Sequence, residues 1–330
     1  PAWFTAQFQL ANPTITLGQA IQIIDYIYGY NAFGEYPADM NQKNAVRFAT
    51  MGTILVDDPF DIDFGGTNKI AIRPLLLGAI THSKPLAVYY EDTSTTRIFA
   101  GANDGMLHSF DQDGNETFAY IPKPVLPAIT SILSGRNGIF FNAAVDGPIT
   151  LFHIDQSNDG IINDGEKAYL IFGYRRGAKG YTVIDVSKRD DPKFVQHINT
   201  EGYSFAQAKI FRKCGAAECR YAGDLTYYLA VPGGYDTCHD TDTPLCLDVD
   251  GLGNLDPDGN VIYIYKFNGT TEKFDIVKQY DPTTPASNPL TRDTEWMRTS
   301  FASTPIPLNT SSKLTVGTEF VYFSDISSTV

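Results

Sequence analysis

The sequence predicts an all-β protein with one short N-terminal helix. Two observations lead to this prediction. The chain is rich in residues that favour strands and turns, with 28 Gly, 19 Tyr, 21 Phe and 19 Pro against only 4 Met. From about Leu75 onward, short apolar or alternating runs are separated by Gly, Asp, Asn and Pro, which is typical of strands joined by turns.

Composition narrows the class of protein further. The 330 residues are 43% hydrophobic, which is enough to bury a sizeable core and excludes disorder as the main state. With 25 Lys and Arg against 38 Asp and Glu, the formal net charge is −13, so nucleic acid is not an expected partner. No apolar run approaches the roughly 20 residues that a membrane-spanning helix needs.

The predicted helix covers residues 18–28. Thr16 is a suitable N-cap residue, and Gly29 is a stop signal. The apolar face of the helix is expected to consist of Ile21, Ile24 and Ile27. We expect no other substantial helix. Residues 1–60 are therefore predicted to form a lead-in segment that packs on a β-rich domain of residues 61–330.

Several of the predicted strands share one arrangement, in which an apolar strand ends in glycine and a turn leads into a second strand. The predicted strands are 86–90, 97–100, 168–172, 181–186, 227–231 and 261–267. The copies of the arrangement are 98–111, 170–186 and 227–267, with 321–325 starting a fourth.

The matching glycines of these copies are Gly101, Gly173 and Gly233. Their unequal spacing favours a modified β-propeller with irregular four-stranded blades and long insertions over a sandwich. A generic antiparallel protein with repeated hairpins is the alternative. Because the last copy stops after one strand, we expect the propeller to be incomplete at the C-terminal end of this chain.

Residues 155–166, DQSNDGIINDGE, match the twelve-residue calcium loop. Oxygen-bearing side chains occupy positions 1, 3, 5, 9 and 12 of the loop, which are Asp155, Ser157, Asp159, Asn163 and Glu166. Gly160 stands at position 6, where the loop must turn sharply, and Ile161 offers its carbonyl at position 7. The flanking residues resemble strands, so we expect a structural or regulatory Ca2+ clamp between strands. A solvated acidic turn is the alternative.

A second acidic stretch, residues 248–260, matches only the first half of such a loop. The matching residues are Asn254, Asp256, Asp258 and Gly259, but position 12 would be Tyr265. A second ion site and a long acidic turn both remain open.

The four cysteines form two close pairs in the sequence, Cys214 with Cys219 and Cys238 with Cys246. Two disulfides fit this arrangement best and indicate an oxidising compartment, although spacing alone does not define the pairing. A zinc site that combines these cysteines with His239 is the alternative, but neither pair has C-x-x-C spacing.

The sequence offers little support for catalysis, and we predict that the protein is not an enzyme. Its histidines are scattered, and no nucleophile elbow, H-E-x-x-H motif or phosphate loop occurs. The five are His82, His108, His153, His197 and His239.

The longest recognisable segment of the sequence is RIFAGANDGMLHSFDQDGNETFAYIPKPVLP at 97–127. Further recognisable segments are 75–88, 145–147, 174–186, 201–210, 233–236, 259–265 and 320–325. Together these segments resemble one family, the PilY/PilC type of type IV pilus-associated tip proteins. The resemblance implies a C-terminal domain that is a modified β-propeller.

The family resemblance also implies a function. It indicates an extracellular protein at the pilus tip or outer-membrane surface that supports pilus biogenesis and extension, adhesion and twitching motility. The implied partners are pilins or minor pilins at the tip, and a host or surface receptor. It implies calcium ligands at Asp155, Ser157, Asp159 and Asn163 and at the Ile161 carbonyl, whereas Glu166 comes from the twelve-position pattern alone.

Two other functions are compatible with parts of the sequence. A carbohydrate-binding, lectin-like module would use exposed tyrosines for adhesion. A quinone-dependent dehydrogenase would share propeller blades with glycine turns. The second alternative is weaker, because Trp3 and Trp296 are the only tryptophans and no adjacent cysteine pair exists to lie over a quinone.

Overall fold

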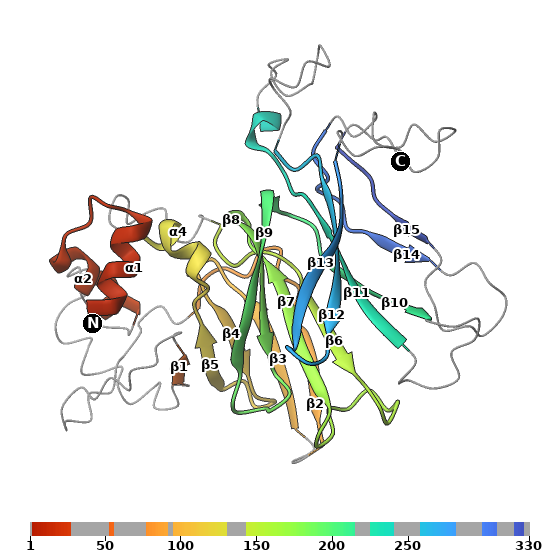
Figure 1. Ribbon diagram of the computed structural model, residues 1–330. Coiled ribbons are helices and arrows are strands. Elements are labelled where there is room, and N and C mark those ends of the chain that lie inside the picture. Colours follow the sequence, from red (N-terminus) through yellow and green to blue (C-terminus); the bar gives the residue numbers. More distant parts are fainter. Residues whose placement is uncertain are drawn as a thin grey trace, which may run out of the picture. The chain divides into compact units, whose positions relative to one another are not determined.

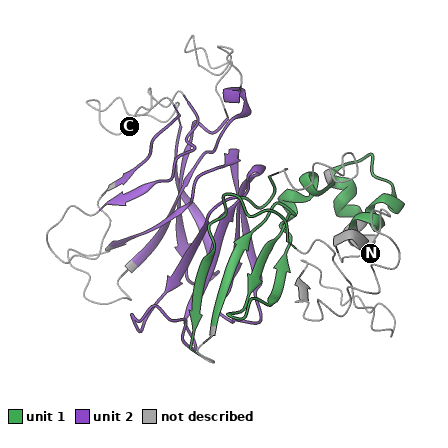
Figure 2. Cartoon of the chain, turned by 180° about the vertical axis from the view of Figure 1, so that it is seen from behind, with its two compact units in different colours: residues 1–146 green, residues 147–330 purple. Residues whose placement is uncertain are grey.

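The structure is a computed structural model of the chain (Figure 1). It describes residues 2–27, 53–55, 77–91, 95–130, 143–214, 225–240, 258–281, 299–308 and 320–326. Most of the regular secondary structure in this part is strand, which confirms the predicted all-β class. The chain divides into two compact units, residues 1–146 and 147–330 (Figure 2). The predicted boundary at residue 60 falls outside the described residues and stays a prediction.

The predicted N-terminal helix is present as α2 (Leu17–Ile27) in the first unit. Its start is a reciprocal capping arrangement. The N–H of Gln19 donates to the Thr16 hydroxyl at 3.3 Å, and the Gln19 side-chain carbonyl accepts the N–H of Thr16 at 3.0 Å. These contacts satisfy two N–H groups at the helix start, as the Thr16 cap predicted.

Two expectations about the helices were wrong. α2 is not the only helix, because α1 (Ala2–Ala11) precedes it and a short α4 (Leu126–Thr130) follows later, after the 3-10 turn η1 (Lys123–Val125). The predicted apolar face is also shifted, since Ile21 is 40% exposed while Ile23 is fully buried. α2 packs against α1, so the position of that neighbour decides which side is covered. The side chains of Ile24 and Ile27 lie outside the described residues.

The first unit contains a five-stranded sheet with the order β1-β5-β4-β3-β2. Its strands are β1 (Thr53–Leu55), β2 (Leu86–Tyr90), β3 (Thr95–Gly101), β4 (Leu107–Phe110) and β5 (Glu116–Tyr120). The strands β2 to β5 pair antiparallel in chain order, and β1 joins β5 in parallel. Consecutive four-stranded pairing of this kind is the arrangement of a propeller blade.

The second unit repeats this pattern in two four-stranded sheets. The first contains β6 (Ile149–Ile154), β7 (Lys167–Gly173), β8 (Arg175–Asp185) and β9 (Lys193–Ser204). The second contains β10 (Lys209–Cys214), β11 (Leu225–Pro232), β12 (Ile262–Asn268) and β13 (Lys273–Tyr280). A further pair consists of β14 (Ile306–Leu308) and β15 (Phe320–Tyr322). All six predicted strand runs overlap strands of the structure, because each is a short apolar or alternating run bounded by turn residues.

The three matching glycines stand at equivalent places, at or just after the end of the second strand of each four-stranded set. They are Gly101, Gly173 and Gly233. A Cβ atom on Gly101 would lie 2.3 Å from the carbonyl oxygen of Val145, and one on Gly233 would lie 2.5 Å from that of Gly259. Gly101 and Gly233 therefore mark places where another backbone segment approaches too closely for a side chain, and at Gly173 the nearest atom to a Cβ is the Ser204 hydroxyl oxygen at 2.8 Å.

The core of the second unit is an aromatic cluster between its two four-stranded sheets. Phe152 on β6 lies at its centre, with ring centroids 4.9 Å from Phe267 and 5.6 Å from Phe274. The centroid of Tyr169 on β7 is 5.7 Å from that of Phe152. Because Phe152 is 1% exposed, this strand is fixed to the core directly beside residue 153.

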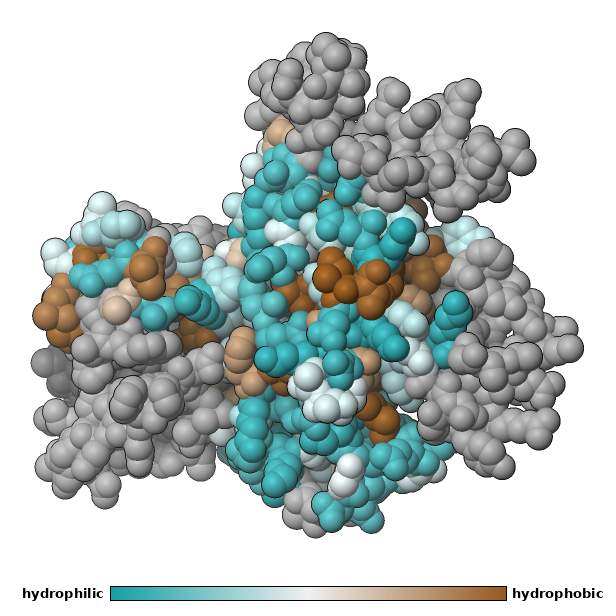
Figure 3. All heavy atoms as spheres, viewed as in Figure 1, coloured by the Kyte–Doolittle hydropathy of each residue, from teal (hydrophilic) through white to brown (hydrophobic). Residues whose placement is uncertain are grey.

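The last strand of the second four-stranded sheet carries apolar residues on its surface. Ile276 and Val277 on β13 are 52% and 49% exposed. Hydrophobic side chains gather on the visible face of Figure 3 over this sheet. No helix in the described part of the chain is long and apolar enough to cross a membrane.

Candidate metal centre

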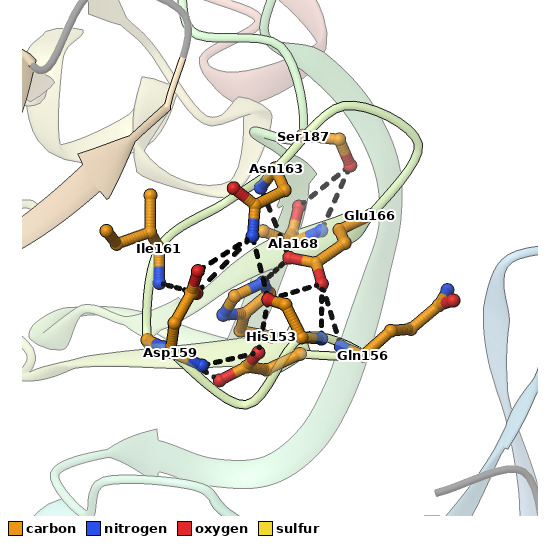
Figure 4. A network of polar contacts seen from close by, with 11 residues as sticks. His153, Gln156, Asp159, Ile161, Asn163, Glu166, Ala168 and Ser187 are labelled. Carbon is orange, nitrogen blue, oxygen red and sulfur yellow. Dashed lines mark hydrogen bonds and ion pairs between the residues drawn. The ribbon is translucent and has the colours of Figure 1, made fainter.

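The predicted calcium loop, residues 155–166, joins β6 to β7 in the second unit (Figure 4). The two strands pair antiparallel, with Ile154 opposite Lys167, so the loop begins and ends at one closed strand pair. Gly160 has φ +76°, the left-handed conformation that position 6 of such a loop requires. The predicted strand flanks are confirmed, and the loop closes sharply at the predicted glycine.

Glu166 is the most strongly held side chain of the loop, with 6% of its surface exposed. Its Oε1 accepts the N–H groups of Gln156 at 2.8 Å and Ser157 at 3.0 Å. Its Oε2 accepts the N–H of Asn163 at 3.1 Å and lies 2.9 Å from His153 Nε2. Burial acts to raise the pKa of Glu166, but the hydrogen bonds from Asn163, Ser157, His153 and Gln156 outweigh it and lower the pKa to about 2. The carboxylate is therefore ionised at neutral pH.

Asp155 and Asp159 close the other side of the loop. Asp155 Oδ2 accepts the N–H of Gly160 at 2.9 Å, and Asp155 Oδ1 accepts the Ser157 hydroxyl at 3.2 Å. Asp159 Oδ1 accepts the N–H of Ile161 at 2.8 Å. This hydrogen bond from Ile161 is the main reason that the pKa of Asp159 lies below its usual value. Both aspartates thus hold the backbone of their own loop.

The Asn163 side chain lies among the oxygens of the loop. Its Nδ2 donates to Ser157 Oγ at 2.7 Å and to Asp159 Oδ2 at 3.1 Å. Because a half-turn exchanges the nitrogen and oxygen of a side-chain amide, this residue can offer an oxygen in the same place. Ile161 enters the network through its N–H, and its predicted role as a carbonyl ligand stays a prediction.

The donor set fits a hard divalent cation. The loop brings together three carboxylates, a hydroxyl and an amide, and oxygen ligands of this kind are those that calcium prefers. One potential ligand atom each of His153, Asp155 and Glu166 lies within 4.8 Å of the other two. All six predicted ligand residues belong to one hydrogen-bonded loop, while ion binding itself stays a prediction.

His153 is the residue of this site that sequence reasoning missed. It was interpreted as one of several scattered histidines, because the calcium-loop pattern begins two residues later. A signal was present, since His153 stands two residues before Asp155 and alternate residues of an extended chain share a face.

The remaining predicted sites are only partly described. Residues 248–257 of the second acidic stretch lie outside the described part. Asp258 pairs with Lys179 at 2.6 Å, and its N–H donates to Asp236 Oδ2 at 2.8 Å. Whether this stretch holds a second ion stays a prediction.

Cys238, on the 3-10 turn η4 (Thr237–Asp240), is disulfide-bonded. A sulfur in a disulfide is not available as a zinc thiolate, which weakens the alternative of a zinc site with His239. Cys219, Cys246 and the side chain of Cys214 lie outside the described residues, so the pairing of the cysteines stays a prediction.

The described part of the chain is an all-β structure with repeated four-stranded antiparallel sets, the arrangement of propeller blades. Residues 76–200 match the family model described as the PilY1 beta-propeller domain, which confirms the resemblance to the PilY/PilC type. This match contains β2 to β8, most of β9 and the whole candidate metal loop.

Individual relatives carry the same name. The chain is 31% identical over 183 residues to the type IV pilus biogenesis factor PilY1 of Pseudomonas aeruginosa (strain PAK), which is 53% of this chain and 15% of that protein. It is 28% identical over 203 residues to a PilY1 homolog of Xylella fastidiosa (strain Temecula1), which is 57% of this chain and 15% of that protein. The chain thus spans a small part of the length of these relatives.

Among solved structures, the chain is similar to the crystal structure of the Pseudomonas aeruginosa PilY1 C-terminal domain. The identity is 22% and the TM-score 0.40, over 71% of this chain and 37% of that chain. The sequence comparisons thus agree on one group of relatives, which are named type IV pilus biogenesis factors.

Proposed function

We propose that this chain is a non-enzymatic, calcium-binding domain of a type IV pilus biogenesis protein at the pilus tip. It supports pilus extension, adhesion and twitching motility through pilin or minor-pilin partners and a surface receptor. One observation carries the calcium part of this proposal: the residues predicted from the twelve-position pattern form a single network in the β6–β7 loop. The pilus part rests on the similarity to PilY1 proteins.

Calcium would act on the charge of the loop. Asp155, Asp159 and Glu166 gather three carboxylates in one loop of a chain whose formal net charge is −13. A bound divalent cation offsets their mutual repulsion and ties the end of β6 to the start of β7. If an ion binds only the folded state and its free concentration is 100 times its Kd, it stabilises that state by about 2.7 kcal/mol.

Calorimetry and thermal melting with Ca2+ test the ion site. We expect Ca2+ to bind and to raise the Tm of the wild-type chain, and the double variant Asp155→Ala, Asp159→Ala to lose both effects. The matched control is Asp111→Ala, Asp113→Ala, which removes two carboxylates from an exposed turn where Asp111 accepts the N–H of Asn115 at 2.8 Å. The calcium proposal is wrong if the wild-type Tm does not respond to Ca2+.

The same two double variants test the pilus function in cells. They are introduced into the gene that encodes this chain in its own bacterium, and surface pili and twitching zones are measured. We expect the loop variant to lose twitching or surface piliation while the turn variant retains both. Equal behaviour of the two variants, with the protein present at equal levels, would show that the loop has no part in pilus function.

A further inference from the structure

His153 and Glu166 form a nearly buried pair beside the metal loop. His153 Nε2 lies 2.9 Å from Glu166 Oε2, and their side chains are 9% and 5% exposed. The imidazole comes from β6, where His153 is paired with Ala168 of β7. Its neighbour Phe152 is fixed in the aromatic core, so the strand holds the histidine on the opposite face, toward the loop.

We propose that His153 is a positioning residue that orients the Glu166 carboxylate for calcium. This inference deepens the proposed function and rests on it. The imidazole donates its Nε2–H to Glu166 Oε2 and holds the carboxylate toward the loop interior before an ion arrives (Figure 4).

His153 differs from the other hydrogen-bond donors to Glu166 because it belongs to strand β6, whereas they belong to the loop. The N–H groups of Gln156, Ser157 and Asn163 belong to the loop itself, so any movement of the loop would carry them along. His153 belongs to a strand whose hydrogen bonds do not depend on the loop. The imidazole is therefore the contact that ties the orientation of the carboxylate to the rigid sheet, and a group ordered in advance loses less freedom when it binds an ion.

The same geometry keeps His153 out of the ligand set for calcium. Calcium takes oxygen ligands, whereas imidazole nitrogen suits zinc, copper and nickel. While the Nε2–H donates to Glu166, that nitrogen has no lone pair to offer a metal. Carboxylates that bind metals are commonly held by hydrogen bonds from neighbouring groups, and loss of such a contact typically weakens metal affinity about 10- to 100-fold.

The contact also bears on the choice between ions. Calcium accepts a carboxylate through both oxygens, whereas magnesium demands a compact octahedron and keeps several waters. A Glu166 side chain that is free to turn can still offer one oxygen, but it presents both less often. We therefore expect loss of His153 to weaken calcium binding more than magnesium binding.

Calorimetric Ca2+ and Mg2+ titrations of the chain test this role. His153→Leu should weaken Ca2+ binding about 10- to 100-fold and lower the ratio of Ca2+ to Mg2+ affinity. His153→Gln, whose amide can still donate to Glu166, should bind Ca2+ within a few-fold of wild type. The control is His197→Leu, on β9 of the same sheet, whose Nδ1 contacts Thr182 Oγ1 at 3.2 Å and which should bind Ca2+ as wild type does.

A double-mutant cycle separates positioning from a general loss of structure. In a Glu166→Gln background, His153→Leu should weaken Ca2+ binding by less than about three-fold, because its target is already altered. Tm values measured in EDTA check that each variant is folded. If His153→Leu is unfolded, His153→Phe keeps a ring at this position and takes its place in the cycle.

Three results would overturn the inference. A His153→Leu protein that binds Ca2+ as tightly as wild type would remove the positioning role and leave the calcium proposal intact. Zn2+ binding that depends on His153, with Ca2+ binding unaffected, would make the imidazole a ligand instead. If wild type does not bind Ca2+ at all, the proposed calcium function fails first and this inference fails with it.

Discussion

His108 Nε2 lies 3.0 Å from Asp104 Oδ2 in the interior of the first unit. The His108 side chain is fully buried, and its Nδ1 is bonded to Glu116. Burial acts to lower the pKa of His108, but the charges and hydrogen bonds of Asp104 and Glu116 outweigh it and raise the pKa to about 9. The residue is therefore a buried imidazolium between two carboxylates at neutral pH, within the GANDGMLHSFD segment that carries the family resemblance.

The contacts of His108 with Asp104 and Glu116 predict that the first unit loses stability at alkaline pH. The pKa of His108 is about 9 in the folded state and 6.5 in the unfolded state, so its contribution is complete below pH 6.5 and is lost as the pH rises through 9. The full contribution is on the order of 3 kcal/mol. Urea unfolding between pH 6 and pH 10 measures it, and His108→Leu should lack this part of the pH dependence. Parallel pH profiles of the two proteins would contradict the prediction.

The aromatic core of the second unit predicts a large effect for Phe152→Ala. Phe152 is 1% exposed and contacts aromatic rings from both four-stranded sheets. Removal of a buried phenylalanine ring typically costs about 3–5 kcal/mol, which denaturant unfolding would detect. Phe194→Ala is the control, because Phe194 is 44% exposed and should change stability by less than about 1 kcal/mol.

The repeated close approach of backbone predicts that Gly233→Ala is destabilising. The new Cβ would lie 2.5 Å from the Gly259 carbonyl oxygen and 2.6 Å from that of Val261, and backbone atoms cannot move aside as a flexible side chain can. We expect a loss of roughly 1–3 kcal/mol in the free energy of unfolding. Gly269→Ala is matched to it, since no atom lies within 4 Å of that Cβ, and it should be nearly neutral. Equal effects at the two positions would refute the packing explanation.

Replacing Gly160 in the 155–166 loop is expected to lower stability through backbone strain and not through a steric clash. Nothing lies within 4 Å of a Cβ at this position, but its φ of +76° is unfavourable for any residue with a side chain. Gly160→Ala should therefore lower stability by about 1–2 kcal/mol through backbone strain alone. Melting in EDTA measures this loss without the ion, and an unchanged Tm would show that the loop adapts at no cost.

The elements that the sequence predicted well depend on local information. The strand runs can be recognised within a short stretch of sequence, because alternation of apolar and polar residues indicates a strand. The calcium-loop pattern can be recognised in the same way, because its positions stand at fixed intervals within twelve residues. Thr16 and Gln19 lie three residues apart, so the helix start was equally local. The matching glycines were recognised for the same reason, although the backbone segments beside them could not be identified.

The features that the sequence did not predict correctly depend on contacts between segments or on weak local signals. α1 was missed because it has no capping signal and only a weak apolar pattern. The exposure of Ile21 depends on where α1 packs, and that position is not encoded in the spacing of isoleucines. His108 looked like an isolated histidine because Glu116, one of its two carboxylate partners, lies on the next strand.

The sequence by itself determined the all-β class, the strand runs and the family resemblance, and it supplied the prediction of six ligand residues in the 155–166 loop. Only the tertiary structure decided that His153 contacts Glu166, that His108 is a buried imidazolium, and that the repeated glycines touch other backbone segments. The physical reason is that periodicity and motifs report a residue's own neighbours in the chain. Burial and charge pairing depend on segments that only folding brings together.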